Sequence, residues 1–191
     1  KMTKFDNTEE TRVLIPAGVE VPIVLSKIEA GTKAGSAQSK HPGRMYDFFK
    51  ITGVILDGKY KGKWVTHRVI CQVERLADGP EKFGFVRHYT QLRKALGLEP
   101  NEIADTVDDV PLLAADWIGK VVNGIVSTED GWGDNAGKKY NGFKDFNKPT
   151  KDQRLSLKEA YAEWEARVKA EQADDVLNGA LDDEEDDNLG F

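Results

Sequence analysis

The amino-acid sequence predicts a mainly β fold with one or two helices and an acidic, disordered C-terminal tail. Two observations support this prediction. Short runs of alternating apolar and polar residues are separated by glycine-rich turns, a pattern typical of small antiparallel barrels. Near the C-terminus, six carboxylates follow one another over 182–187, and like charges with almost no apolar surface do not fold alone.

The 191 residues are expected to form one domain with appendages. We expect a flexible N-terminus over 1–12, a folded domain over 13–150, an amphipathic helix over 151–173 and the acidic tail over 174–191. No run is apolar enough to span a membrane, and the polar start carries no signal-peptide pattern, so a cytoplasmic location is expected. Cys71 is the only cysteine, which excludes an internal disulfide and a cysteine-based zinc site.

Charge is distributed unevenly along the chain. Residues 174–191 carry 8 acidic and no basic side chains, whereas residues 27–94 carry 14 Lys or Arg against 6 Asp or Glu. The net charge of −6 therefore conceals a basic body with an acidic extension. This asymmetry indicates a protein that binds polyanions and carries its own competitor.

The first strand is expected over 13–28, with a bend near Pro22 and a place at a sheet edge. Residues 31–43 are rich in Gly, Ala, Ser and Lys, which predicts a mobile loop. The loop contains Lys33 and Lys40 and no acid. It is interpreted either as an ordinary surface loop or as a loop that closes over a bound strand.

Two further strands are expected over 44–56 and 64–74, joined as an antiparallel hairpin by the turn signal Asp57-Gly58. The alternation assigns one side of each strand to the core: Met45, Phe49, Ile51 and Ile55 in the first, and Val65, His67, Val69, Cys71 and Val73 in the second. The opposite sides interleave rings with cations: Arg44, Tyr46, Phe48 and Lys50 in the first, and Trp64 and Arg68 in the second.

An exposed sheet face of this composition suits unpaired bases, because rings stack on bases while Arg and Lys neutralise phosphates. The alternative is that Tyr46, Phe48 and Trp64 pack beneath a second layer, since aromatic residues of strands are usually buried. His67 is interpreted as a buried structural histidine rather than a ligand.

A helix is predicted over 85–96, ending at Gly97, with Arg87, Arg93 and Lys94 on its outer side. In a five-stranded barrel, this helix would close the bottom between the third and fourth strands. A fourth strand is expected over 120–128.

The segment 130–146 mixes glycines, rings and lysines. It is interpreted either as a hairpin that grips nucleic acid or as a surface hairpin whose rings point inward. The sequence Ser156-Leu157-Lys158-Glu159 predicts a capping box. The helix that follows would carry the apolar stripe Leu157, Tyr161, Trp164 and Val168 and dock on the domain or on another subunit.

No catalytic constellation is found in the sequence. There is no phosphate-binding loop motif and no nucleophile elbow, and the three histidines lack the spacing of metal ligands. Asp47 with Asp57 and Lys59 could fit a metal-dependent nuclease, but the hairpin turn already accounts for Asp57. We therefore expect no enzyme activity, no cofactor and no metal.

The sequence also resembles a known family through several short motifs. These are Pro-Ala-Gly at 16–18, the lysine–glycine loop at 33–35, V-I-L-D-G-K-Y-K-G-K at 54–63, L-R-K-A-L-G-L at 92–98 and W-I-G-K-V-V at 117–122. Together they resemble a family of phage-encoded proteins, long listed as of unknown function, that belong with phage replication and recombination functions and are considered to bind single-stranded DNA. The resemblance covers roughly 14–146.

The tail separately resembles that of phage single-stranded-DNA-binding proteins of the phage T7 type. It ends in Leu189, Gly190 and Phe191, with Gly190 where the usual bacterial tip has Pro. The resemblance implies that the tail recruits replication or recombination proteins and competes with DNA. The tail residues concerned are Asp182, Asp183, Glu184, Glu185, Asp186, Asp187, Leu189 and Phe191.

These observations predict a single-stranded-DNA-binding protein of an infected bacterial host, with an OB-like five-stranded Greek-key barrel and possible homodimerisation. The alternatives are an adaptor or inhibitor whose tail mimics DNA, a small phage nuclease, and an RNA-binding module. The predicted DNA-binding residues are Lys33, Lys40, Arg44, Tyr46, Phe48, Lys50, Lys61, Lys63, Trp64, Arg68, Trp132, Lys138, Lys139, Tyr140 and Phe143.

Overall fold

The computed structural model describes residues 14–35, 42–73, 87–98, 116–130 and 137–182. The chain divides into two units, Lys1–Thr150 and Lys151–Phe191, and each is described by itself. The expected flexible N-terminus, 1–12, lies outside the described residues. No helix in the described part of the chain is long and apolar enough to cross a membrane.

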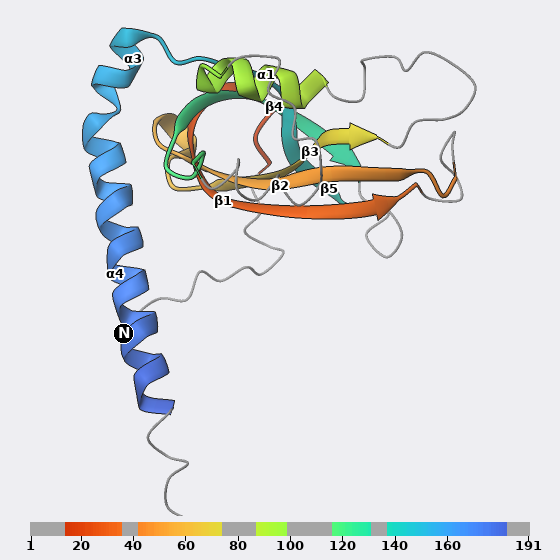
Figure 1. Ribbon diagram of the computed structural model, residues 1–191. Coiled ribbons are helices and arrows are strands. Elements are labelled where there is room, and N and C mark those ends of the chain that lie inside the picture. Colours follow the sequence, from red (N-terminus) through yellow and green to blue (C-terminus); the bar gives the residue numbers. More distant parts are fainter. Residues whose placement is uncertain (1–13, 36–41, 74–86, 99–115, 131–136, 183–191) are drawn as a thin grey trace, which may run out of the picture. The chain divides into compact units, whose positions relative to one another are not determined.

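The first unit is built on one antiparallel sheet of five strands, in the order β3-β2-β1-β4-β5. The mainly β prediction is confirmed (Figure 1). The strands are β1 (Glu20–Ala34), β2 (Met45–Ile55), β3 (Trp64–Val73), β4 (Val121–Asp130) and β5 (Lys139–Asn147).

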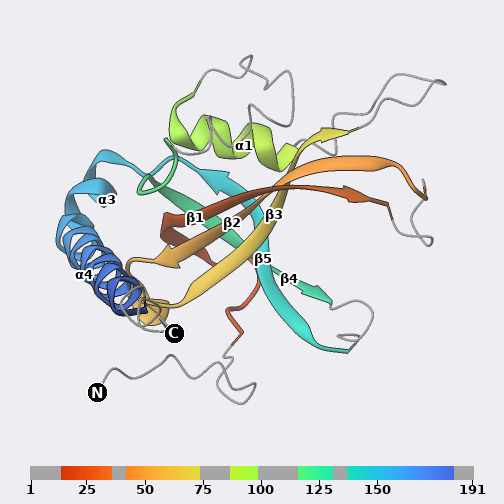
Figure 2. The same cartoon turned by 60° about the horizontal axis from the view of Figure 1, so that its bottom comes forward.

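The sheet curls until its two edge strands, β3 and β5, come into contact (Figure 2). Helix α1 (Arg87–Leu96) follows β3 in the chain and packs against β3, β4 and β5. It therefore covers the place where the two edges of the sheet meet. Gly97, with φ of +77°, ends this helix as the sequence predicted.

The β2–β3 connection is the predicted hairpin. Asp57 accepts a hydrogen bond from the backbone N–H of Gly58 at 2.7 Å, and a short 3-10 turn (η2, Gly58–Tyr60) follows. Gly58 and Gly62 both have positive φ, a conformation that glycine adopts without strain. This local chemistry fixes the antiparallel pairing of β2 with β3.

Strand β1 differs from its prediction in place and in length. It lies in the centre of the sheet, between β2 and β4, rather than at an edge, and its irregularity falls between Leu25 and Lys27 rather than at Pro22. It also continues to Ala34, so the first part of the expected loop over 31–43 is strand. Pairing with β2 holds this second half extended despite its small residues.

The predicted core faces of β2 and β3 are confirmed for every described position except Met45. Met45 is 41% exposed, because it begins β2 opposite Ala34, the last residue of β1. Arg93, expected on the outer side of α1, is buried with its guanidinium over the Tyr89 ring. The core includes Val21, Ile23, Leu25, Phe49, Ile51, Ile55, Val65, Val69, Tyr89, Leu92, Trp117, Val122, Val126, Phe143 and Phe146.

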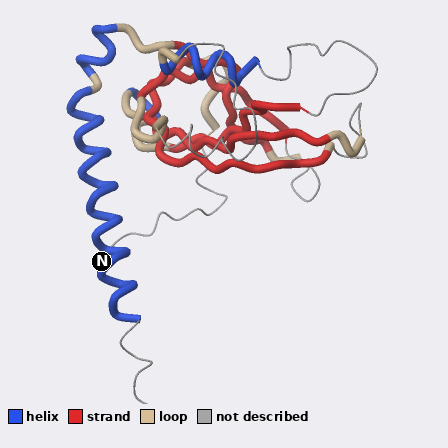
Figure 3. Tube along the Cα trace, viewed as in Figure 1, coloured by secondary structure: helices blue, strands red, loops and turns tan. Residues whose placement is uncertain are grey.

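The second unit consists of α3 (Lys151–Ser156) and α4 (Lys158–Asp182), seen as helices in Figure 3. Helix therefore begins before the predicted capping box, and Ser156 Oγ donates to the carbonyl oxygen of Gln153. Helix α4 continues past the expected boundary at residue 173. Tyr161 and Trp164 of the predicted stripe are in contact, with ring centroids 5.5 Å apart and ring planes tilted by 44°.

Candidate functional site

The outward side of strands β1, β2 and β3 forms a continuous surface, called here the outer face. Cross-strand pairing arranges it in rows, and the central row joins Glu29 of β1, Lys50 of β2 and Arg68 of β3. The neighbouring row places Gly31 beside Phe48. The charged and aromatic members of the outer face are Lys27, Glu29, Lys33, Tyr46, Phe48, Lys50, Trp64 and Arg68.

Phe48 lies flat on the outer face because its neighbour on β1 is a glycine. A Cβ added to Gly31 would lie 2.8 Å from the tip of the Phe48 ring, so only glycine leaves room for the ring there. The Arg68 guanidinium lies over the same ring, 5.2 Å from its centroid. The Phe48 ring thus contacts both the glycine of β1 and the guanidinium of Arg68 on β3.

Two lysines of the outer face, Lys27 and Lys50, pair with one carboxylate, that of Glu29. Lys27 Nζ is 2.8 Å from Glu29 Oε1, and Lys50 Nζ is 3.2 Å from Glu29 Oε2. The Lys27 ammonium, followed by that of Lys50, holds the pKa of the Glu29 carboxyl below its usual range. Lys33 and Arg68 are also exposed.

A second group of rings and cations lies at the β2–β3 turn. Trp64 is 43% exposed, which is unusual for so large an apolar side chain. The ammonium groups of Lys59 and Lys63 lie 5.6 and 5.9 Å from the centroid of the Tyr60 ring. Lys61 is exposed beside them. The predictions for Lys61, Lys63 and Trp64 therefore fall on accessible positions.

The predicted DNA contacts of two residues, Phe143 and Arg44, are wrong because both side chains are buried. Phe143 is fully buried and packs on Phe146 at 5.3 Å between ring centroids. The β4–β5 register shifts between Ile125 and Val126. In a regular strand, residues 143 and 146 would point to opposite sides of the sheet, but the shift brings both rings to the inner side. Arg44 is only 7% exposed, and its guanidinium lies over the Tyr46 ring.

The other predicted residues of the β4–β5 hairpin are accessible to different degrees. Lys138 and Lys139 are exposed, with Lys139 Nζ 3.3 Å from Asp130 Oδ1, and Tyr140 is half-buried. The free end of this hairpin diverges from that of β1–β2 (Figure 2). Of the remaining predictions, Lys40, Trp132 and tail residues 183–191 lie outside the described residues, as does the side chain of Asp182.

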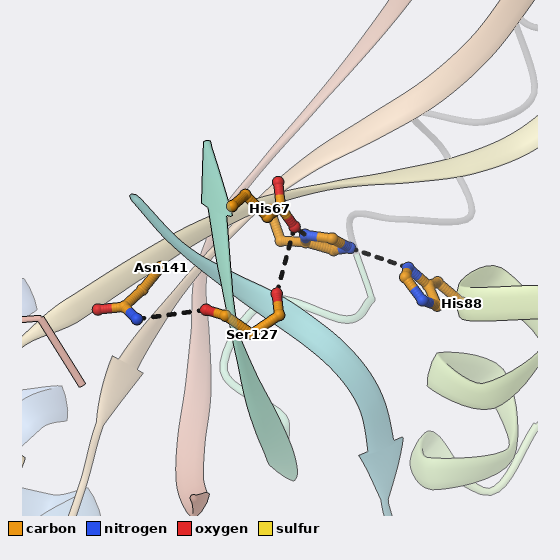
Figure 4. A network of polar contacts seen from close by, with 5 residues as sticks. His67, His88, Ser127 and Asn141 are labelled. Carbon is orange, nitrogen blue, oxygen red and sulfur yellow. Dashed lines mark hydrogen bonds and ion pairs between the residues drawn. The ribbon is translucent and has the colours of Figure 1, made fainter. Parts of the chain in front are cut away.

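A polar network that runs from the buried His67 to the exposed Glu129 ties the curled sheet to α1 (Figure 4). His67 Nε2 and His88 Nδ1 are 3.0 Å apart, and His67 Nδ1 is 3.5 Å from Glu129 Oε1. Ser127 Oγ donates to the same carboxylate oxygen at 3.2 Å, and Asn141 Nδ2 donates to the Ser127 carbonyl oxygen. The network therefore links β3, α1, β4 and β5 where the sheet edges meet.

The order of groups in this network favours a structural role. In a hydrolytic triad, the hydroxyl donates to an imidazole that a carboxylate orients. Here the Ser127 hydroxyl donates to the Glu129 carboxylate instead. The His67 ring also packs against Phe143 and Phe146, with centroids 6.1 and 6.4 Å away. These contacts accord with the expectation that His67 is a structural histidine.

The network predicts that acid weakens the fold. Burial, followed by the charge of His67, lowers the pKa of His88, while Asp145 and Glu129 oppose the shift and Arg87 adds to it. A folded-state pKa below that of the unfolded chain means that the stabilisation is present above about pH 6.5 and is lost as the pH falls. We expect the melting temperature to fall between about pH 7.5 and 5.5.

The matched variant is His88→Asn, whose side-chain N–H can still donate to His67 but does not titrate. Its melting temperature should depend less on pH over the same range than that of the wild-type protein. Thermal unfolding followed by circular dichroism at a series of pH values measures both. Parallel pH profiles for the two proteins would contradict the assignment to His88.

The sequence analysis missed Lys27 and Glu29 of the outer face and Tyr60 of the group at the β2–β3 turn. Lys27 lies inside the expected first strand, and Glu29, Gly31 and Lys33 follow it at intervals of two residues along β1. Continuing the period of two past residue 28 would have placed all four on one side of the strand. Tyr60 lies inside the turn motif between two lysines, which is itself a ring-and-cation signal.

Comparisons with protein-family models, curated proteins and solved structures find no match.

Proposed function

We propose that the protein binds single-stranded DNA in phage replication or recombination, and that it acts by binding rather than by catalysis. The observation that carries the proposal is the outer face, where accessible rings and cations share one side of three paired strands. Rings stack on bases of any sequence, and Lys and Arg neutralise the phosphates. Trp64 and Phe48 would stack bases, while Lys33, Lys50 and Arg68 would contact the backbone.

The topology supports an OB-like assignment for the first unit. Strand β1 pairs with both β2 and β4, β3 approaches β5, and α1 lies between β3 and β4 in the chain. A five-stranded, partly open Greek-key barrel binds oligonucleotides on the face of its second and third strands and on its β1–β2 and β4–β5 loops. Those are the elements that carry the predicted contact residues in this chain.

The acidic tail would act as an internal competitor for the basic face. Residues 183–187 are all acidic and are followed by Leu189 and Phe191. A polyanion on the same chain competes with DNA at a high effective concentration. Once DNA displaces it, the tail would present its apolar tip to a replication or recombination protein.

The proposal is tested by an anisotropy titration of labelled oligo-dT and of its duplex, at several salt concentrations. The whole chain is compared with a version that ends at Asp182, which keeps every described helix and strand. We expect the protein to bind single-stranded DNA more tightly than the duplex. For each phosphate that the protein neutralises, the logarithm of the affinity should fall by about 0.7 per tenfold rise in salt concentration. Truncation should tighten binding, because it removes the acids over 183–187.

Each alternative gives a different outcome in the same titration. If neither protein binds at low salt, the outer face is not a DNA site, and an adaptor that acts through its tail becomes the better reading. Equal competition by an oligo-rU of the same length would indicate general single-strand binding. Divalent-metal-dependent cleavage of the labelled strand would indicate a nuclease.

A further inference from the structure

Glu29 is a carboxylate at the centre of a surface that otherwise suits anions. It lies on β1 directly across from Lys50 on β2, which in turn lies across from Arg68 on β3. Its two oxygens contact different ammonium groups, Oε1 that of Lys27 at 2.8 Å and Oε2 that of Lys50 at 3.2 Å. The carboxylate therefore bridges two cations from neighbouring strands.

This arrangement resembles the contacts of a backbone phosphate. A phosphodiester has two non-bridging oxygens that share one negative charge, and lysine ammonium groups bind such oxygens as point charges. Glu29 presents two oxygens and one charge to the same pair of ammonium groups. All three side chains are accessible, with relative exposures of 65% for Lys27, 46% for Lys50 and 41% for Glu29. An incoming anion can reach both lysines.

Exchange of one anion for another is also energetically feasible here. Exposed ion pairs contribute little to the stability of a fold, because water screens them. Both pairs made by Glu29 join exposed side chains, so breaking them is expected to cost the sheet little. The lowered pKa of Glu29 shows that a negative charge is favoured at this position.

We infer that Lys27 and Lys50 form a backbone-phosphate position of the nucleic-acid site, and that Glu29 occupies it until a strand displaces the carboxylate. The inference rests on the proposed function and adds a contact residue, Lys27, and an internal competitor within the folded unit. With Glu29 in place, the two lysines share one counter-charge. Without it, both are free to neutralise phosphates.

The test compares the full-length wild-type protein with Glu29→Gln and with Glu165→Gln. Glutamine keeps the size of the side chain and removes its charge. Glu165 is a matched control, because it is also half-exposed and also pairs with a lysine, Lys169 at 3.7 Å, but lies on α4. Anisotropy titrations with labelled oligo-dT at several salt concentrations give the affinity and its salt dependence, and thermal unfolding checks that all three proteins fold.

We expect Glu29→Gln to bind roughly fivefold more tightly at low salt, as removal of one repulsive charge at contact distance in water predicts. Its plot of log affinity against log salt should steepen by about 0.7, the value for one further phosphate. Glu165→Gln should match the wild type in both respects.

The outcomes distinguish a failure of the phosphate position from a failure of the proposed function. If the wild-type protein binds DNA and Glu29→Gln binds with the same affinity and salt slope, the phosphate position is wrong, whereas the proposed function stands. An equal gain in Glu165→Gln also overturns it, because the effect would then reflect net charge alone. Lack of binding by all three folded proteins overturns the proposed function and this inference together.

Discussion

Replacing Phe48 and Trp64 together by alanine is expected to weaken binding of oligo-dT by about 2–6 kcal/mol, since one base stacked on a ring contributes about 1–3 kcal/mol. This corresponds to roughly 30-fold or more in the dissociation constant. Trp64 is among the most exposed large apolar side chains of the described residues, so its loss should cost the fold little. Phe48 is half-buried and should cost more.

The salt dependence distinguishes stacking from charge neutralisation in the same experiment. The two rings carry no charge, so the double variant should lose affinity at every salt concentration while the slope stays that of the wild type. Removing a phosphate contact would instead make the slope shallower. Anisotropy titrations over a range of salt concentrations therefore assign the loss to the correct interaction.

Two control variants complete this prediction. Ile118→Ala removes an apolar side chain of similar exposure from outside the outer face and should bind as the wild type does. Trp64→Phe with Phe48 unchanged keeps a ring at each position and should retain most of the affinity. If the double alanine variant folds and binds with wild-type affinity, the rings do not contact bases and the outer face has another role.

The arrangement of the outer face could be predicted from the sequence where local rules determine structure. The Asp57-Gly58 turn fixes the β2–β3 hairpin, and the period of two along 49–55 and 64–71 separates core from surface. Gly97 ends α1 because its positive φ suits a glycine. Each of these signals lies within a few residues of the feature that it determines.

The rest depended on contacts between distant parts of the chain. The second half of β1 contains small and polar residues that are typical of a loop, and only pairing with β2 keeps it extended to Ala34. The pairing shift in β4–β5 turned Phe143 inward, against the alternation that a regular strand would have. A local sequence pattern predicts neither which strand a given strand pairs with nor where a bulge falls.

Phe143→Ala should lower the free energy of unfolding by about 3–5 kcal/mol, the usual cost of truncating a buried phenylalanine. The ring is fully buried and contacts Phe146 and His67. A Cβ added to Gly124 would lie 2.5 Å from this ring, which shows that the ring fills the space above that glycine. Urea unfolding followed by far-ultraviolet circular dichroism measures the loss.

A loss of this size is a large part of the stability of a typical domain, so Phe143→Leu provides a milder variant that should remain folded. We expect Phe143→Leu to lose less stability than Phe143→Ala and to bind oligo-dT with wild-type affinity, because leucine still fills most of the core position. Wild-type stability combined with weakened DNA binding in Phe143→Leu would instead place the ring in the binding site. The pair of measurements thus decides whether Phe143 acts as a core residue or as a stacking platform, the two interpretations that the sequence left open for the rings of 130–146.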